Sequence, residues 1–277
     1  MNRTIGKVGP ISIAGILLLA ALVMSGLTAF AYQPQDGASG ANAMLKHAPA
    51  GSANLQWDPQ SKALTVTLSL TGLQANSRHP AHIHAGDCSI DGTILYPLND
   101  VVADAAGNAT TTTVIPNVTG GIPATGWYIN VHSGPTLATP AEMVPVTCGN
   151  VTNPNAAQSL TVTLDGTSGP NQMAAGTATL SLEGDTLTVK TTMSNLVPGS
   201  SHAAHIHAGS CEKQLPGNIL YHLMPLTADS SGNATSVTTI KGVTTIPITG
   251  WYINIHFSTD LSTQAGYDVI ACGNVVN

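Results

Sequence analysis

The chain contains one heptapeptide twice, as Gly126-Trp-Tyr-Ile-Asn-Val-His132 and as Gly250-Trp-Tyr-Ile-Asn-Ile-His256. In the first copy, Trp127, Ile129 and Val131 alternate with Tyr, Asn and His, which is the period-two pattern of a β-strand. The apolar residues therefore share one face, and the polar ones share the other. The heptapeptide predicts a strand that buries one face and presents a histidine on the opposite face.

The repeat extends beyond this heptapeptide. The block His79-Pro-Ala-His-Ile-His-Ala-Gly-Asp-Cys88 returns 123 residues later as His202-Ala-Ala-His-Ile-His-Ala-Gly-Ser-Cys211. The segment Cys148-Gly-Asn-Val151 returns 124 residues later as Cys272-Gly-Asn-Val275. A period of this length is far too long for a solenoid repeat and matches a whole small domain. The chain therefore carries two copies of one domain.

The domain boundaries follow from the extent of the repeat. The first copy covers residues 38–152 and the second covers residues 156–277. Asn, Thr and Pro cluster at Val151–Ala157, as is typical of a linker. We therefore expect a cut between Asn153 and Pro154 to release two halves that fold separately.

Period-two patterns recur in both copies, and no amphipathic helix is evident after the N-terminal segment. Apolar residues alternate with Thr and Ser at Leu64, Val66, Leu68 and Leu70. Gly184-Asp185 separates two further alternating runs, as in a tight hairpin. Short strands divided by turn signals indicate antiparallel sandwiches. We predict an all-β chain of two tandem Greek-key β-sandwiches.

Composition and charge narrow the range of functions. Hydrophobic residues make up 43% of the chain and charged residues only 8%, which favours a folded protein over a disordered one. After Ala31, six basic residues stand against fourteen acidic ones, a net charge of −8 with no basic run. Because such a surface repels a phosphate backbone, we exclude nucleic acid as a partner.

The N-terminus has the features of an export signal. Arg3 and Lys7 precede an uncharged apolar stretch, and Ala29-Phe-Ala31 supplies the small residues at which a signal peptidase cuts. Residues 1–31 are therefore a signal peptide or, if they are not cleaved, a membrane anchor long enough to span a bilayer. In both cases the domains lie outside the cytoplasm, and the membrane is a partner only through this segment.

The four cysteines fall two per copy at matching positions, Cys88 with Cys148 and Cys211 with Cys272. In an exported chain an even number distributed in this way favours disulfides within each copy. Such bonds close loops of 60 and 61 residues, and chain entropy predicts about 4 kcal/mol of stabilisation from each. The alternative is thiolate metal ligation, but the closely spaced cysteine pairs of zinc-ribbon sites are missing.

Eight of the ten histidines belong to the duplicated pattern. His82 and His84 are two residues apart, so on a strand they project from one face, and His132 joins them if its strand is a neighbour. Three imidazoles suit copper or zinc, and we predict a site for copper before zinc. The second copy repeats the set at His205, His207 and His256. The alternative is that these are structural histidines that hydrogen-bond to backbone carbonyls.

His79 and His202 begin the duplicated block, three residues before His82 and His205. Strand alternation directs them to the opposite face from the predicted ligands. We therefore expect them to support the site through hydrogen bonds instead of ligating the metal.

These residues resemble two related families. The His-x-x-His-x-His-x-Gly-x-Cys block, the later histidine and the final Cys-Gly are similar to a Cu,Zn superoxide dismutase. The Ala-His-Ile-His-Ala-Gly block followed by Trp-Tyr-Ile-Asn-Val-His-Ser is still more similar to the CHRD domain, a β-sandwich module first described in chordin. The dismutase resemblance implies that His82, His84 and His132 are copper ligands and that Cys88 bridges to Cys148. It implies the same roles for His205, His207, His256, Cys211 and Cys272.

The chain departs from the dismutase pattern in the residues that bind zinc. A dismutase has a bridging histidine shortly after the first cysteine and further zinc ligands behind it, whereas residues 89–104 hold no histidine here. The second copy has only His222, eleven residues after Cys211, and Pro97 takes its place in the first copy. We therefore expect His222 to be incidental.

The guiding arginine of a dismutase, three residues before the final cysteine, is also absent. Pro145 and Val269 occupy that position here. The only enzymatic activity that the resemblance suggests is a copper-dependent superoxide dismutase-like one, and these departures argue against efficient turnover.

Three functions follow from the sequence. The first is an exported protein that binds copper through three histidines in each domain. The second is a non-catalytic extracellular or matrix module with structural histidines, whose partner is another protein or a glycan. The CHRD resemblance implies this function, because CHRD modules are mostly known as extracellular binding modules. The third is a copper-dependent superoxide dismutase.

Overall fold

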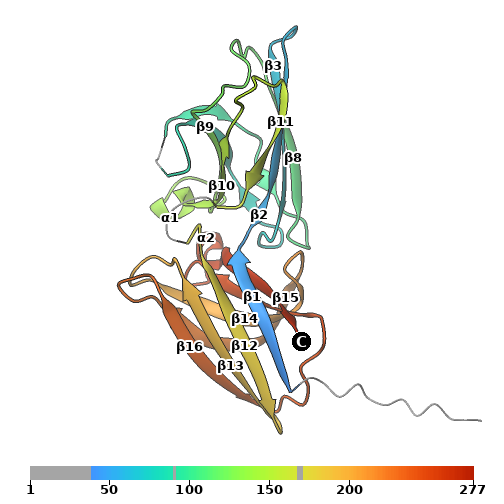
Figure 1. Ribbon diagram of the computed structural model, residues 1–277, viewed down its shortest axis with the longest axis vertical. Helices are drawn as coiled ribbons and strands as arrows, with labels where there is room; N and C mark the ends of the chain where they lie inside the picture. Colours follow the sequence, from blue (N-terminus) through green and yellow to red (C-terminus); the bar gives the residue numbers. More distant parts are fainter. Residues whose placement is uncertain (1–38, 90–91, 167–170) are drawn as a thin grey trace, which may run out of the picture. The chain divides into compact units, whose positions relative to one another are not determined.

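The computed structural model describes residues 39–89, 92–166 and 171–277, and the predicted signal or anchor segment, residues 1–31, lies outside them. Within the described residues nearly every regular element is a strand, as predicted (Figure 1). The strands are β1 (Gly40–His47), β2 (Ala50–Asp58), β3 (Ala63–Thr71), β4 (Arg78–His79), β5 (Ala81–Ala85), β6 (Ile94–Pro97), β7 (Val101–Val102), β8 (Ala109–Ile115), β9 (Trp127–His132), β10 (Pro145–Val151), β11 (Ser159–Leu164), β12 (Ala175–Glu183), β13 (Thr186–Ser194), β14 (Ser201–Ser210), β15 (Lys213–Thr227), β16 (Ala234–Lys241), β17 (Trp251–His256) and β18 (Val269–Val276). Two one-turn helices, α1 (Pro140–Met143) and α2 (Gln264–Tyr267), precede β10 and β18.

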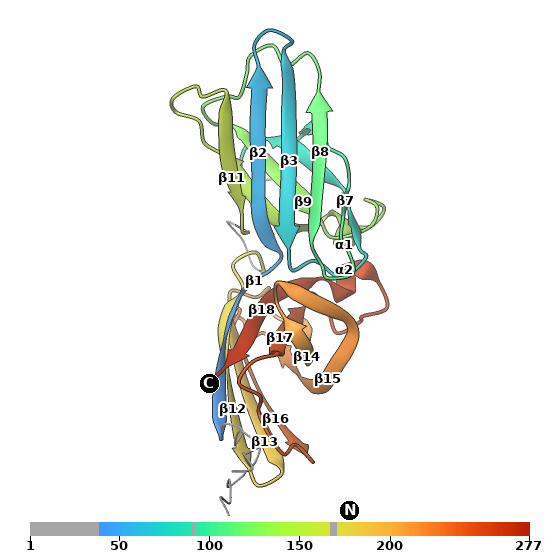
Figure 2. The same ribbon diagram turned by 90° about the vertical axis from the view of Figure 1, so that its right-hand side faces the viewer.

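The first sandwich consists of two four-stranded antiparallel sheets, ordered β11-β2-β3-β8 and β10-β9-β5-β6. Figure 2 shows the strands of the first sheet side by side. Leu64, Val66 and Leu68 of β3 are at most 1% exposed and belong to one core with Ile83 of β5 and Ile129 of β9. The predicted alternation in β3 and β9 is therefore confirmed.

The second sandwich is built from one eight-stranded sheet, ordered β15-β14-β17-β18-β1-β12-β13-β16. The sheet curls so that its two halves enclose a core that includes Leu180, Leu187, Ile206 and Ile253. Gly184-Asp185 forms the predicted two-residue hairpin, because β12 and β13 pair up to Glu183 and Thr186.

The first strand of each copy lies in the other sandwich. In the second sandwich β1 pairs with β12 and β18, whereas β2, which follows β1 in the chain, pairs with β3 and β11 in the first (Figure 1). Strand β11 stands at the head of the second copy, yet it pairs with β2. The ranges 38–152 and 156–277 thus describe the two copies along the chain. In the folded protein, the first strand of each copy belongs to the sandwich formed by the rest of the other copy.

Local chemistry explains why β1 does not turn back onto β2. Only Ala48 and Pro49 separate the two strands. A two-residue hairpin needs a positive φ at its first central position, and the residue before a proline prefers an extended backbone. The chain therefore continues from one sandwich into the other.

The segment that we expected to be a linker is an ordered turn. Asn153 is 3% exposed, its amide donates to the carbonyl oxygens of Ile122 and Ala157, and its side-chain oxygen accepts from Ala157 N. This turn keeps the chain on the first sandwich, where β11 completes the sheet.

Candidate metal centres

The first group of histidines lies where β5 and β9 pair. His82 and His84 share one face of β5, and His132 ends β9, the antiparallel neighbour of β5. One ring nitrogen from each of the three lies within 4.8 Å of the others. His132 Nε2 is 3.1 Å from His82 Nδ1. The structure thus brings together the three residues that the sequence predicted.

Backbone carbonyls orient two of these rings. His84 Nδ1 lies 2.9 Å from the carbonyl oxygen of Gly92, and His132 Nδ1 lies 2.7 Å from that of Met143. A carbonyl oxygen only accepts, so each Nδ1 carries the proton and each Nε2 keeps a lone pair. His84 Nε2 is buried and has no hydrogen-bond partner in the described part of the chain.

The second group repeats this geometry. His205, His207 and His256 also place one nitrogen each within 4.8 Å of the others, and they are 3%, 3% and 0% exposed. His205 Nδ1 is 3.1 Å from His256 Nε2, and His256 Nδ1 donates to the carbonyl oxygen of Tyr267 at 2.6 Å. His207 Nε2 is buried without a hydrogen-bond partner among the described residues, as His84 Nε2 is.

Burial keeps four of the six imidazoles neutral. The loss of hydration, with the neighbouring imidazoles adding to it, lowers the pKa of His82 to about 4 and that of His205 to about 3. The same burial lowers the pKa of His207 and of His256 to about 4. The neutral ring is the form that ligates a metal, so at neutral pH these four rings carry no positive charge that would oppose metal binding.

His79 and His202 support the sites through the backbone. His79 Nδ1 donates to the carbonyl oxygen of His132, and His202 Nδ1 donates to that of His256, both at 2.8 Å. Both side chains are fully buried, and each Nε2 contacts a serine hydroxyl, of Ser77 and of Ser200 respectively. They fix the ends of β9 and β17, which carry the third histidine of each group.

A tyrosine stacks on one histidine of each group, which the sequence argument missed. Tyr128 lies against His84 with ring centroids 4.9 Å apart, and Tyr252 lies against His207 at 5.0 Å. The signal was present, because both copies of the heptapeptide place a tyrosine on the histidine face.

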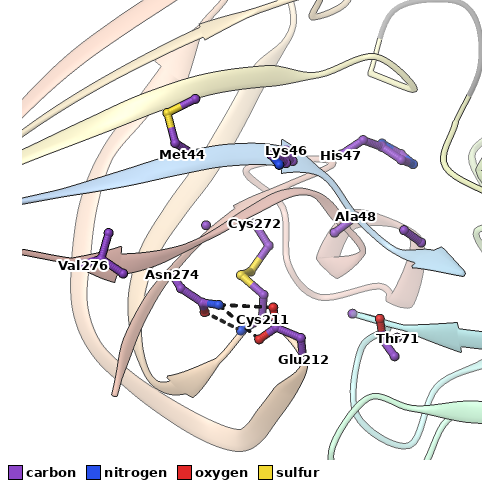
Figure 3. Close-up of a pocket in the computed structure, with 13 residues that line it drawn as sticks. Met44, Lys46, His47, Ala48, Thr71, Cys211, Glu212, Cys272, Asn274 and Val276 are labelled. Carbon is purple, nitrogen blue, oxygen red and sulfur yellow. Dashed lines mark hydrogen bonds between the residues drawn. A yellow bond between two sulfur atoms is a disulfide. The ribbon is translucent and has the colours of Figure 1, made fainter. Parts of the chain in front are cut away.

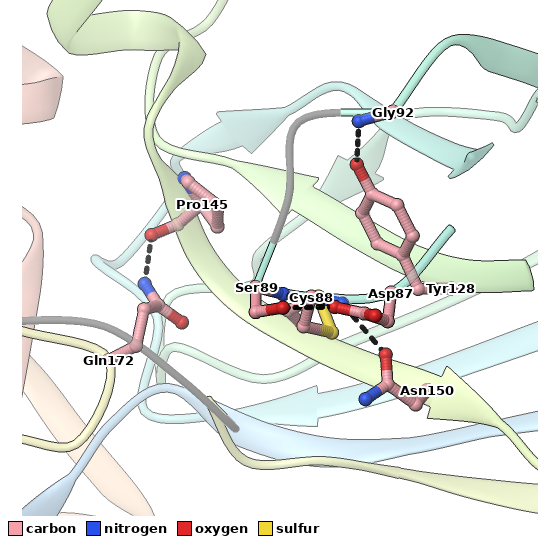
Figure 4. Close-up of a disulfide and its surroundings, with 9 residues drawn as sticks. Asp87, Cys88, Ser89, Gly92, Tyr128, Pro145, Asn150 and Gln172 are labelled. Atoms are coloured by element: carbon pink, nitrogen blue, oxygen red, sulfur yellow. Dashed lines mark hydrogen bonds between the residues drawn. A yellow bond between two sulfur atoms is a disulfide. The ribbon is translucent and has the colours of Figure 1, made fainter. Parts of the chain in front are cut away.

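Gly92 positions two aromatic side chains of the first site, and the sequence did not predict this role. Its N–H donates to the hydroxyl of Tyr128 at 2.9 Å (Figure 4), and its carbonyl accepts from His84. A Cβ atom at this position would lie 1.7 Å from the carbonyl oxygen of Ala85, so only glycine fits.

The first site opens into a pocket of about 660 Å³. Its polar wall contains His84, His132 and Asn130, and its rim includes the exposed side chains of Ile94 and Met143. The side-chain oxygen of Asn130 is buried without a hydrogen-bond partner in the described part of the chain, and so is that of Asn254 in the second copy. The pocket leaves room for a further small ligand beside the three nitrogens.

His222 lies next to the second site, where we expected it to be incidental. It stands directly opposite His205 in the pairing of β14 with β15, and the two ring centroids are 4.7 Å apart in an edge-on arrangement. Pro97 takes the matching place opposite His82 in the first copy. The register between β14 and β15 places His222 beside His205, and the sequence alone did not specify this register.

With this geometry in hand, comparison with known families is informative. The family model of the CHRD domain matches residues 32–136 and 160–260, which contain all six of the converging histidines. The chain belongs to the CHRD domain family. The first CHRD match includes β1, and the second includes β11 except for Ser159, so each match contains the strand that pairs in the other sandwich. A search of curated proteins found no match.

Both copies contain the predicted disulfide, Cys88–Cys148 in the first and Cys211–Cys272 in the second, and each joins the CHRD match to a cysteine just after it. Asn150 accepts a hydrogen bond from Cys88 N at 2.8 Å, and Asn274 accepts one from Cys211 N at 2.8 Å (Figures 3 and 4). The asparagine of the repeated Cys-Gly-Asn segment therefore fixes the loop that each disulfide ties down.

CHRD domains are extracellular modules, and the two disulfides fit such a setting. No helix among the described residues is long and apolar enough to cross a membrane.

Proposed function

We propose that this chain is an exported tandem CHRD protein that binds one copper ion through three imidazoles in each domain. One observation carries the proposal: both domains converge three ring nitrogens within 4.8 Å, and each leaves a buried Nε2, of His84 or His207, without a hydrogen-bond partner among the residues that the structure describes.

A purely structural role does not explain the unpartnered nitrogens. A buried polar atom without a hydrogen bond costs about 1–3 kcal/mol, and the same atom has none in both domains. Structural histidines of this chain look different, since both ring nitrogens of His79 and of His202 have a partner. A metal ion bound by the three nitrogens would remove the penalty.

The donor set favours copper. Imidazole suits copper and zinc, and of the two divalent ions copper binds such a site more tightly. All four cysteines are in disulfides, so no thiolate competes as a ligand. One ring nitrogen of each histidine lies within 4.8 Å of the other two in its group, and the carbonyls of Gly92, Met143 and Tyr267 orient the rings of His84, His132 and His256. When bound, copper would supply a redox-active centre or a tightly held cargo.

The proposal concerns binding and not superoxide turnover. The only arginine among the described residues, Arg78, forms an ion pair with Asp100. The charge after Ala31 is −8, which repels an anionic substrate.

A copper titration of the metal-free protein tests the proposal. We expect two copper ions per chain by elemental analysis, and one after either His84→Ala or His207→Ala. His79→Gln separates support from ligation, since this histidine donates to the backbone carbonyl of His132 and is not one of the converging residues: the variant should still bind two copper ions, but the first of its sites should bind less tightly. If the unchanged protein binds no copper or zinc, the extracellular binding module with structural histidines replaces the proposal.

A further inference from the structure

The second site has an additional imidazole next to His205. His222 is an exposed residue of β15, and its backbone pairs directly with His205 of β14. Directly opposed residues of an antiparallel pair point to the same face with Cβ atoms about 4.5–5.5 Å apart. His222 therefore stands on the face that carries His205 and His207, and its ring already packs edge-on against that of His205.

In the described part of the first site, no equivalent donor stands opposite His82. Pro97 is the residue opposite His82, and proline has no side-chain atom that binds a metal. The two sites therefore share three imidazoles and differ in the residue next to the first of them.

We propose that His222 is a fourth imidazole ligand of the copper ion in the second domain, while the first domain binds copper through three imidazoles alone. This inference rests on the proposed function. The three converging nitrogens are those of His205, His207 and His256, and His222 is the next imidazole outward. Exposed side chains change rotamer within nanoseconds, so His222 reaches the ion without a change in the strands.

The chemistry of Cu(II) favours this arrangement. Cu(II) prefers square-planar or tetragonal sites built from nitrogen and oxygen ligands. Three imidazoles leave the fourth position to water or another small ligand, whereas His222 fills it with nitrogen. Even changes in residues that only hydrogen-bond to ligands alter metal affinity by about 10–100-fold. Loss of a ligand should therefore weaken the second site at least about tenfold.

The test uses protein with one site removed. His84→Ala leaves the second site and His207→Ala leaves the first, so each can be titrated alone with Cu(II) against a competing chelator. Adding His222→Phe to His84→Ala keeps an aromatic ring against His205 but removes the donor. We expect at least about tenfold weaker Cu(II) binding and an electron paramagnetic resonance spectrum with one fewer coupled nitrogen. Because His222 is exposed, the variant should keep its fold, which circular dichroism checks.

Two negative results are distinguishable. If His84→Ala protein binds one Cu(II) and His222→Phe changes neither affinity nor spectrum, His222 is not a ligand and the three-imidazole proposal stands. If His84→Ala protein binds no Cu(II), the proposed function itself fails for the second domain. As a matched control, His222→Phe in the His207→Ala protein should leave the first site unchanged.

Discussion

The two histidine sites agree in what positions the histidines and differ in the residues around them. Each has two histidines on one strand, a third at the end of the next strand, and a tyrosine stacked on the second. Around the first lie Pro97 and Met143, and around the second lie His222 and Tyr267. Duplication has kept the backbone carbonyl that orients the third histidine, since a carbonyl does not depend on the side chain. The residues at the rim have diverged, so the two sites should differ in exposure and ligand number.

The same comparison applies to the sandwiches. Each is completed by the first strand of the other copy, β1 in the second and β11 in the first. Stability of one domain therefore depends on residues that belong to the other copy in the sequence.

The largest expected effect comes from separating the copies. Expressed alone, residues 38–152 lack β11 and residues 156–277 lack β1, so neither half should fold. This reverses the expectation of separately folding halves. When the intact protein is cut between Asn153 and Pro154, the halves should stay together in gel filtration. Each disulfide lies within one half, so only the exchanged strands and the contacts between halves would hold them. Recovery of two separate folded halves would show that the strands are not exchanged.

A smaller effect is expected from a substitution in one copy that destabilises the sandwich formed mainly by the other copy. Leu45 of β1 and Leu164 of β11 are at most 1% exposed. Leu45→Ala should lower the free energy of unfolding of the second sandwich by about 2–5 kcal/mol, and Leu164→Ala should do the same to the first. Amide hydrogen exchange locates the loss: Leu45→Ala should raise exchange in β12 and β18. Faster exchange in β3 instead would contradict the observed pairing.

The smallest effect is a pH dependence of the metal-free protein. Burial lowers the pKa of His82 to about 4 and of His205 to about 3 from an ordinary value of 6.5. Below pH 6.5 these histidines bind protons in the unfolded chain but not in the folded one. The free energy of unfolding should therefore fall as the pH drops from 7 to 5. Urea unfolding midpoints at these pH values measure the slope. His205→Gln should make the slope shallower, and an unchanged slope would show that this histidine is not buried in solution.

Local periodicity explains how much of the fold could be predicted. Alternation in β3 and β9 identifies the strands and their buried faces because it depends only on neighbouring residues. Both disulfides could be predicted because the cysteines occur two per copy at matching positions of an exported chain. The partner of β1 could not be found in this way, since alternation shows that a segment is a strand and not which sheet it joins. Ala48-Pro49, which is unsuited to a tight hairpin, was the one available signal.

In the candidate sites, too, the features that depend on local sequence could be predicted, and those that depend on long-range pairing could not. His82 and His84 could be paired from their spacing, but the carbonyl of Met143 lies at the end of α1 and the N–H of Gly92 precedes β6, in segments between strands whose course the sequence does not specify. The position of His222 depends on the register between β14 and β15, which shifts at Ile206 and His207. The residues around each group of histidines could therefore not be predicted, because their positions depend on long-range strand register and on the course of the connecting segments.

Crystals of the copper-loaded protein, measured with X-rays above and below the copper absorption edge, test the two-site proposal most directly. We expect one anomalous peak in each sandwich, about 2.0–2.2 Å from the ring nitrogens of His82, His84 and His132 in the first and of His205, His207 and His256 in the second. Anomalous peaks elsewhere, or none at either group of histidines, would contradict the proposal.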